Sequence, residues 1–99
     1  HPLTVPAVMD LANAIIVMIA IAIGSASHSL ITAWVFRNVG STPSPGFISV
    51  VWFILYSLAL LPGGFALPHF FFAFLGCVFA FWRIKRFNEK STPKAARYF

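Results

Sequence analysis

Charge is what this chain has least of. Between Asp10 and Arg83 the only charged side chain is Arg37. Charged residues make up 9% of the chain and hydrophobic residues 60%, whereas soluble proteins carry about 25% charged residues. A protein of only 99 residues must expose most of its side chains, so these must face lipid or other membrane-embedded protein. The composition excludes a soluble domain and predicts an integral membrane protein.

Acidic residues and cysteine are also scarce, which limits the chemistry available. The two acids, Asp10 and Glu89, both lie outside the apolar stretches, so proton-relay or cation-coupled transport lacks its usual intramembrane carboxylate. The single cysteine, Cys77, excludes an internal disulfide and a metal-binding cysteine pair. No phosphate-binding glycine loop is present, and no nucleophile is paired with a base. We therefore expect a protein that is not an enzyme and requires no cofactor.

Two long apolar stretches are present. Leu11–Phe36 would form a helix of about 39 Å, enough to cross the roughly 30 Å hydrocarbon core. Phe47–Trp82 would measure about 54 Å as one helix, too long for a bilayer, and prolines and glycines interrupt it between Pro62 and Pro68. We therefore predict a single all-α membrane domain with three transmembrane helices. Its expected parts are helices at about 7–36, 47–61 and 68–87, a loop at 37–46, a turn at 62–67 and a basic tail at 88–99. The alternative has two transmembrane helices and a re-entrant segment at 47–61.

The positive charges predict the orientation of these helices. Apart from Arg37, every Lys and Arg lies from Arg83 onward. Three crossings place all of them on one side of the membrane, which is the positive-inside pattern. Trp34, Trp52 and Trp82 then approach the same interface, where indole rings prefer to lie. We expect the C-terminus on the cytoplasmic, matrix or stromal side, with a bacterial inner, mitochondrial inner or thylakoid membrane all open.

The basic residues at the end of the third predicted helix indicate a partner. Arg83, Lys85 and Arg86 directly follow an apolar segment. A basic flank of this kind is typical of contact with anionic lipid headgroups. We therefore expect anionic lipids as partners and no nucleic acid.

The first predicted helix carries small and polar residues along one side. Asn13, Ala20, Gly24 and Ser27 fall on one stripe at helical spacing. Ala20 and Gly24 form a small-x-x-x-small pair, which lets another helix approach closely. We expect this stripe to be a helix-packing surface.

His28 is the one ionisable residue well inside an apolar stretch, which makes it a functional candidate. One interpretation is a neutral imidazole hydrogen-bonded to a neighbouring helix or to the Gly24 carbonyl. The other is an axial ligand to haem iron or to the magnesium of a chlorophyll-type pigment. The segment from Gly24 to His28 resembles the small-x-x-x-His pattern of bacterial antenna polypeptides, over these residues alone. His69 is expected at the opposite interface, too far in depth to be a second ligand to the same haem.

These observations lead to three functional hypotheses. The first is a non-catalytic accessory subunit of a larger membrane complex, respiratory or photosynthetic, that braces neighbouring subunits and orders lipid or pigment. The second is a tetrapyrrole-binding subunit with His28 as the ligand. The third is a small pore-forming protein of the holin type, which also ends in a basic tail. The chain begins at His1, so we expect either a removed leader or a start downstream of the initiator Met.

Overall fold

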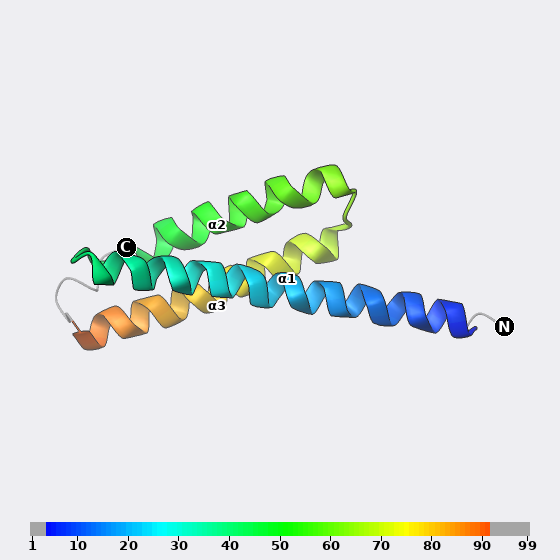
Figure 1. Cartoon of the computed structure of the whole chain (residues 1–99), viewed down its shortest axis with the longest axis horizontal. Coiled ribbons are helices and arrows are strands. Elements are labelled where there is room, and N and C mark those ends of the chain that lie inside the picture. Colours follow the sequence, from blue (N-terminus) through cyan, green and yellow to red (C-terminus); the bar gives the residue numbers. More distant parts are fainter. Residues whose placement is uncertain (1–3, 92–99) are drawn as a thin grey trace.

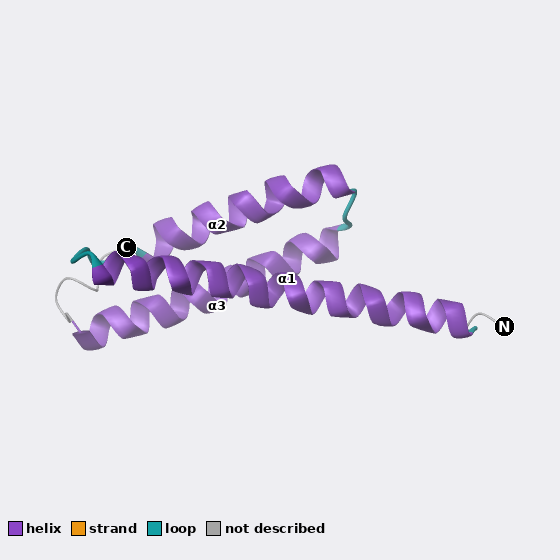
Figure 2. Ribbon diagram, viewed as in Figure 1, coloured by secondary structure: helices purple, strands orange, loops and turns teal. Residues whose placement is uncertain are grey.

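The computed structural model describes residues 4–91, which form three helices (Figure 1). These are α1 (Val5–Asn38), α2 (Pro45–Leu60) and α3 (Leu67–Ser91), with a short 3-10 turn, η1 (Leu61–Gly63), after α2. No strand occurs among the described residues (Figure 2). Three helices are long and apolar enough to cross a membrane, α2 being counted together with η1. The predicted fold class, an all-α integral membrane protein with three transmembrane helices, is confirmed.

The first two helices begin at residues 5 and 45 rather than at 7 and 47. The cause is a side-chain cap at each start. The Ala7 N–H donates to Thr4 Oγ1 at 3.3 Å, and the Phe47 N–H donates to Ser44 Oγ at 3.3 Å. A proline follows each cap within the first two helical positions, where its missing N–H costs no hydrogen bond.

The connection between α2 and α3 is a tight turn that reverses the chain. Gly64 has a φ of 69°, in the left-handed region that glycine enters without steric cost. Its N–H donates to the Leu61 carbonyl oxygen at 3.2 Å. α3 then starts at Leu67 with Pro68 in its first turn, so α2 and α3 form a helical hairpin.

The C-terminal end of α3 extends to Ser91, four residues beyond the expected boundary at 87. The physical reason is Asn88, a polar residue that is buried. Its Nδ2 donates to the Pro43 carbonyl oxygen at 2.7 Å, which fastens the last turns of α3 to the loop between α1 and α2. The beginning of the predicted basic tail is therefore helical, and its remainder, 92–99, lies outside the described residues.

The core contains two buried clusters, and each combines side chains of all three helices. One consists of Ala33, Ile48, Ala80 and Ile84, and the other of Ile21, Leu60 and Ala73. The large apolar side chains not in these clusters are mostly exposed on the outside of the bundle, as expected where lipid is the solvent.

A line of small residues joins the two clusters. On α1 the buried positions follow one another at a spacing of four residues, and the facing side of α3 carries small residues. A Cβ on Gly76 would collide with Ser25 Oγ and with the carbonyl oxygen of Ala22, so the two backbones approach closely there. The Ser25 hydroxyl donates across the contact to the Ala73 carbonyl oxygen at 3.2 Å. We call this contact the α1–α3 seam; it comprises Ile21, Ser25, Ser29 and Ala33 of α1 with Ala73, Gly76, Ala80 and Ile84 of α3.

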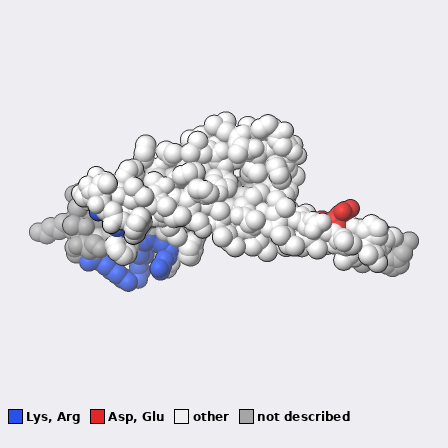
Figure 3. Space-filling view, in the orientation of Figure 1, with Lys and Arg blue, Asp and Glu red and all other residues white. Residues whose placement is uncertain are grey.

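The molecule is elongated and its two ends differ. α1 projects beyond the α2–α3 turn (Figure 1), and no residue from 5 to 20 is buried. We call residues 5–20 the α1 arm. Lys and Arg gather at the opposite end, around the last turns of α1 and α3 (Figure 3). We call this the cationic end.

Candidate functional site

His28 lies in a hydrogen-bonded aromatic group between α1 and α2. Its Nδ1 is 2.7 Å from the Gly24 carbonyl oxygen and 2.8 Å from the Tyr56 hydroxyl oxygen. The Trp52 ring lies against the imidazole, with 4.7 Å between ring centroids. The Trp52 indole N–H donates to the Thr32 hydroxyl at 2.8 Å, and that hydroxyl donates to the His28 carbonyl oxygen at 2.8 Å. We call these five residues the His28 cluster.

The Gly24 contact determines which imidazole nitrogen carries the proton. A carbonyl oxygen can only accept, so the hydrogen-bonding geometry assigns the proton of a neutral ring to Nδ1. With this assignment the Tyr56 oxygen accepts from the same N–H, and Nε2 is the nitrogen without a proton. The hydrogen bonds that the first interpretation of His28 expects are present, one to its own helix and one to a neighbouring helix. The second, axial ligation through the other nitrogen, stays a prediction.

His69 lies apart from the His28 cluster, in the first turn of α3 beside the α2–α3 turn. Its ring contacts Phe65, with 4.9 Å between ring centroids. Its Nδ1 is buried and has no hydrogen-bond partner among the described residues. Within residues 4–91 no group of three or more His, Cys, Asp or Glu side chains could hold a metal ion.

The four predicted helix-packing residues lie mostly outside the bundle. Asn13, Ala20 and Ser27 are exposed. Gly24 is half-buried, and a Cβ there would lie 2.6 Å from Tyr56 Oη. Packing inside the chain uses the α1–α3 seam instead, which the sequence reasoning missed although its small residues repeat at the same helical spacing. The role of the exposed residues in packing against another chain stays a prediction.

At the cationic end, Arg37 joins α1 to α3. Its guanidinium carbon lies 4.0 Å from the centroid of the Phe87 ring, and its Nη2 donates to Asn88 Oδ1 at 3.4 Å. Asn88 in turn donates to the loop carbonyl of Pro43. None of these partners is anionic, so the charge of Arg37 is not neutralised by them. The sequence placed Arg37 in a loop; it lies in the last turn of α1.

The three predicted lipid-contacting residues separate into two faces of α3. Arg83 and Arg86 lie beside the Trp82 ring, at 5.9 and 5.6 Å from its centroid. Both border a cleft that Lys90 and Arg37 also line. Lys85 does not border this cleft, and its Nζ lies 5.9 Å from the Phe81 ring centroid. Lys90 could not be predicted from the sequence as a member of this group, because the cleft exists only where α1 and α3 cross.

No family model, curated protein or solved structure matches this chain. Three features of its geometry bear on function: the His28 cluster, the α1 arm with its exposed stripe, and the cationic end.

Proposed function

We propose that this chain is a non-catalytic accessory subunit of a larger membrane protein complex, in which it braces neighbouring subunits and orders lipid. Respiratory and photosynthetic complexes are the hosts we favour. The observation that carries the proposal is the α1 arm, which is helical and mostly apolar and contains no buried residue within the described part of the chain.

The length of α1 supports this proposal. α1 has 34 residues, or about 51 Å of helix, whereas the hydrocarbon core is roughly 30 Å thick. The second span, Pro45–Gly63, has 19 residues, about 29 Å, and therefore matches that thickness. With the cationic end at one membrane surface, the α1 arm extends past the other surface.

The side chains of the α1 arm are poorly suited to water. Leu11 is 58% exposed and Ile16 is 61% exposed. An exposed apolar surface of this kind is typical of a contact with another protein. Asn13 and Ala20, both exposed on the same helix, supply the hydrogen-bonding group and the small residue that favour close helix–helix association. A neighbouring subunit that packs on the α1 arm would cover these apolar groups.

The experiment is extraction of the tagged chain from its own membrane in mild detergent, followed by native electrophoresis. We expect the wild-type chain to migrate with a large complex. Ala20→Leu adds bulk on the α1 stripe and should release the chain, because the added side chain separates helices that small residues bring together. The matched control is Ala59→Leu, the same substitution at an exposed position of α2, which should leave the chain bound.

Two outcomes would contradict the subunit role. One is a wild-type chain that migrates alone after mild extraction, with no larger species. The other is membrane leakage when the chain is expressed by itself, which is the behaviour of the pore-forming alternative.

One observation favours a second candidate function, tetrapyrrole binding at His28. A ligating histidine commonly donates its other ring N–H to a carbonyl oxygen, which fixes the orientation of the ring. In the His28 cluster, Nδ1 is held in this way by Gly24, and His28 is an exposed residue. A visible absorbance band that depends on His28 would support this function.

A further inference from the structure

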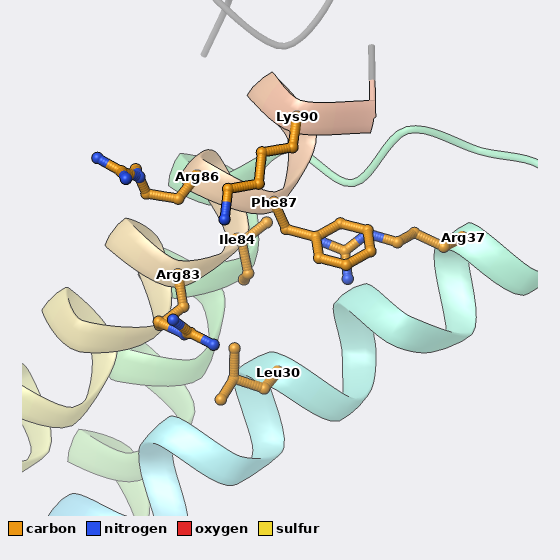
Figure 4. Close-up of a pocket in the computed structure, with 7 residues that line it drawn as sticks. All are labelled: Leu30, Arg37, Arg83, Ile84, Arg86, Phe87 and Lys90. Carbon is orange, nitrogen blue, oxygen red and sulfur yellow. The ribbon is translucent and has the colours of Figure 1, made fainter. Parts of the chain in front are cut away.

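We propose that the cleft between α1 and α3 at the cationic end binds the phosphate-bearing headgroup of an anionic membrane lipid. The cleft has a volume of about 170 Å³ and is bordered by four cationic side chains, Arg37, Arg83, Arg86 and Lys90. In Figure 4 the Arg83 side chain reaches toward α1 and Lys90 bends back toward the cleft, whereas Arg86 extends away from the other three. This volume is several times that needed for one water molecule, and it leaves room for a small anionic group.

The charges around the cleft are not compensated by the described part of the chain. No carboxylate borders the cleft. Arg37 donates one long hydrogen bond, to the neutral amide of Asn88, and its Nε is buried without a partner in residues 4–91. Like charges held together at a membrane surface repel one another, and an anion between them removes that repulsion. A phosphate group fits because it offers several oxygens to the planar, multiply donating guanidinium of arginine.

The floor of the cleft favours a lipid over a free anion. Leu30, Ile84 and Phe87 line it with apolar side chains (Figure 4). Trp82, which lies beside Arg83 and is 50% exposed, has the setting of an indole at a membrane interface. The lining of the cleft therefore combines cationic groups with apolar carbon. A molecule with an anionic head and an acyl chain complements both parts.

This lipid site rests on the proposed function: it locates the lipid-ordering role at the cationic end and specifies anionic lipids. It is tested on the isolated chain, so its failure is distinguishable from failure of the subunit role, which is read from co-migration with a complex. The purified full chain in a non-ionic detergent is titrated with phosphatidylglycerol, and bound lipid is counted by native mass spectrometry. We expect one preferred phosphatidylglycerol per chain. Phosphatidylcholine, which carries no net charge, should bind at least about tenfold more weakly.

Substitutions that each remove one positive charge from α3 show where the lipid binds. We expect Arg83→Gln and Lys90→Gln each to weaken phosphatidylglycerol binding by about fivefold. The matched control is Lys85→Gln, which removes the same charge from the same helix outside the cleft and should change binding by less than about twofold. Helix content measured by circular dichroism confirms that the variants remain folded.

Three results would overturn the inference. If Lys85→Gln weakens binding as much as Arg83→Gln, the attraction is diffuse and the cleft is not a site. If phosphatidylcholine binds as tightly as phosphatidylglycerol, the cations do not select the ligand. If millimolar inorganic phosphate displaces phosphatidylglycerol completely, the ligand is a free anion and the acyl chain contributes nothing.

Discussion

Individual hydrogen bonds orient the polar side chains at the two candidate ligand sites of this chain, the His28 cluster and the cationic end. In the His28 cluster, the contact of Nδ1 with the Gly24 carbonyl oxygen, 2.7 Å long, orients the ring and leaves Nε2 basic. At the cationic end, Asn88 satisfies the Pro43 carbonyl oxygen and accepts from Arg37. His28 and Asn88 thus each bind a backbone carbonyl oxygen of the chain.

A prediction at this scale concerns His28. If a tetrapyrrole is bound, His28→Leu should remove the visible absorbance of the protein purified from its native membrane, because the axial nitrogen is lost. Tyr56→Phe should keep the band, since the Gly24 carbonyl still holds the Nδ1–H. The measurement is the visible spectrum of both variants beside wild type. A colourless wild-type protein, or an unchanged band in His28→Leu, would refute ligation by this residue.

At the scale of the element, the α1–α3 seam holds the bundle together through small residues. Gly76 is the closest point, where a Cβ would meet both Ser25 Oγ and the Ala22 backbone. Backbone atoms cannot rotate away from an added side chain, so a larger residue there must separate the helices.

We therefore expect Gly76→Leu to lower the free energy of unfolding by about 1–3 kcal/mol. The control is Phe79→Leu on the same helix, where the ring is 51% exposed and the change should be within about 0.5 kcal/mol. Unfolding in mixed micelles of mild and denaturing detergent, followed by circular dichroism, measures both. Equal stability of Gly76→Leu and Phe79→Leu would argue against close packing at the seam.

The elements themselves could be predicted from the sequence, because charge, hydropathy and proline act locally. The face on which α1 packs could not. Ala20 with Gly24 and Ser25 with Ser29 are both small pairs at a spacing of four, and local pattern does not distinguish them. The choice depends on α3, where Gly76 leaves room for Ser25. The end of α3 escaped prediction for the same reason, since Asn88 is held by the distant Pro43.

At the scale of the whole molecule, positive charge is concentrated at one end of an elongated bundle of 59 × 25 × 19 Å. An apolar body with cations at one end has a preferred direction in a membrane, because cationic flanks are retained on the cytoplasmic side. With three crossings, we expect the two ends of the chain on opposite sides of the membrane.

Cysteine labelling tests this orientation. In a Cys77→Ala background, Val5→Cys and Ala95→Cys should react with a membrane-impermeant thiol reagent from opposite sides of sealed vesicles. The Val5→Cys protein should react from outside in right-side-out vesicles, and Ala95→Cys only after the vesicles are opened. Reaction of both positions from the same side would contradict a three-crossing topology.

The pairing of α1 with α3 also has a consequence for biosynthesis. Membrane helices leave the ribosome in chain order, and N-terminal parts are available first. The α1–α3 seam therefore cannot form until α3 has been synthesised, since the residues that face Ser25 lie beyond residue 66. If translation stops in the α2–α3 turn, the product contains only α1 and α2. The His28 cluster can then form, but the α1–α3 seam cannot.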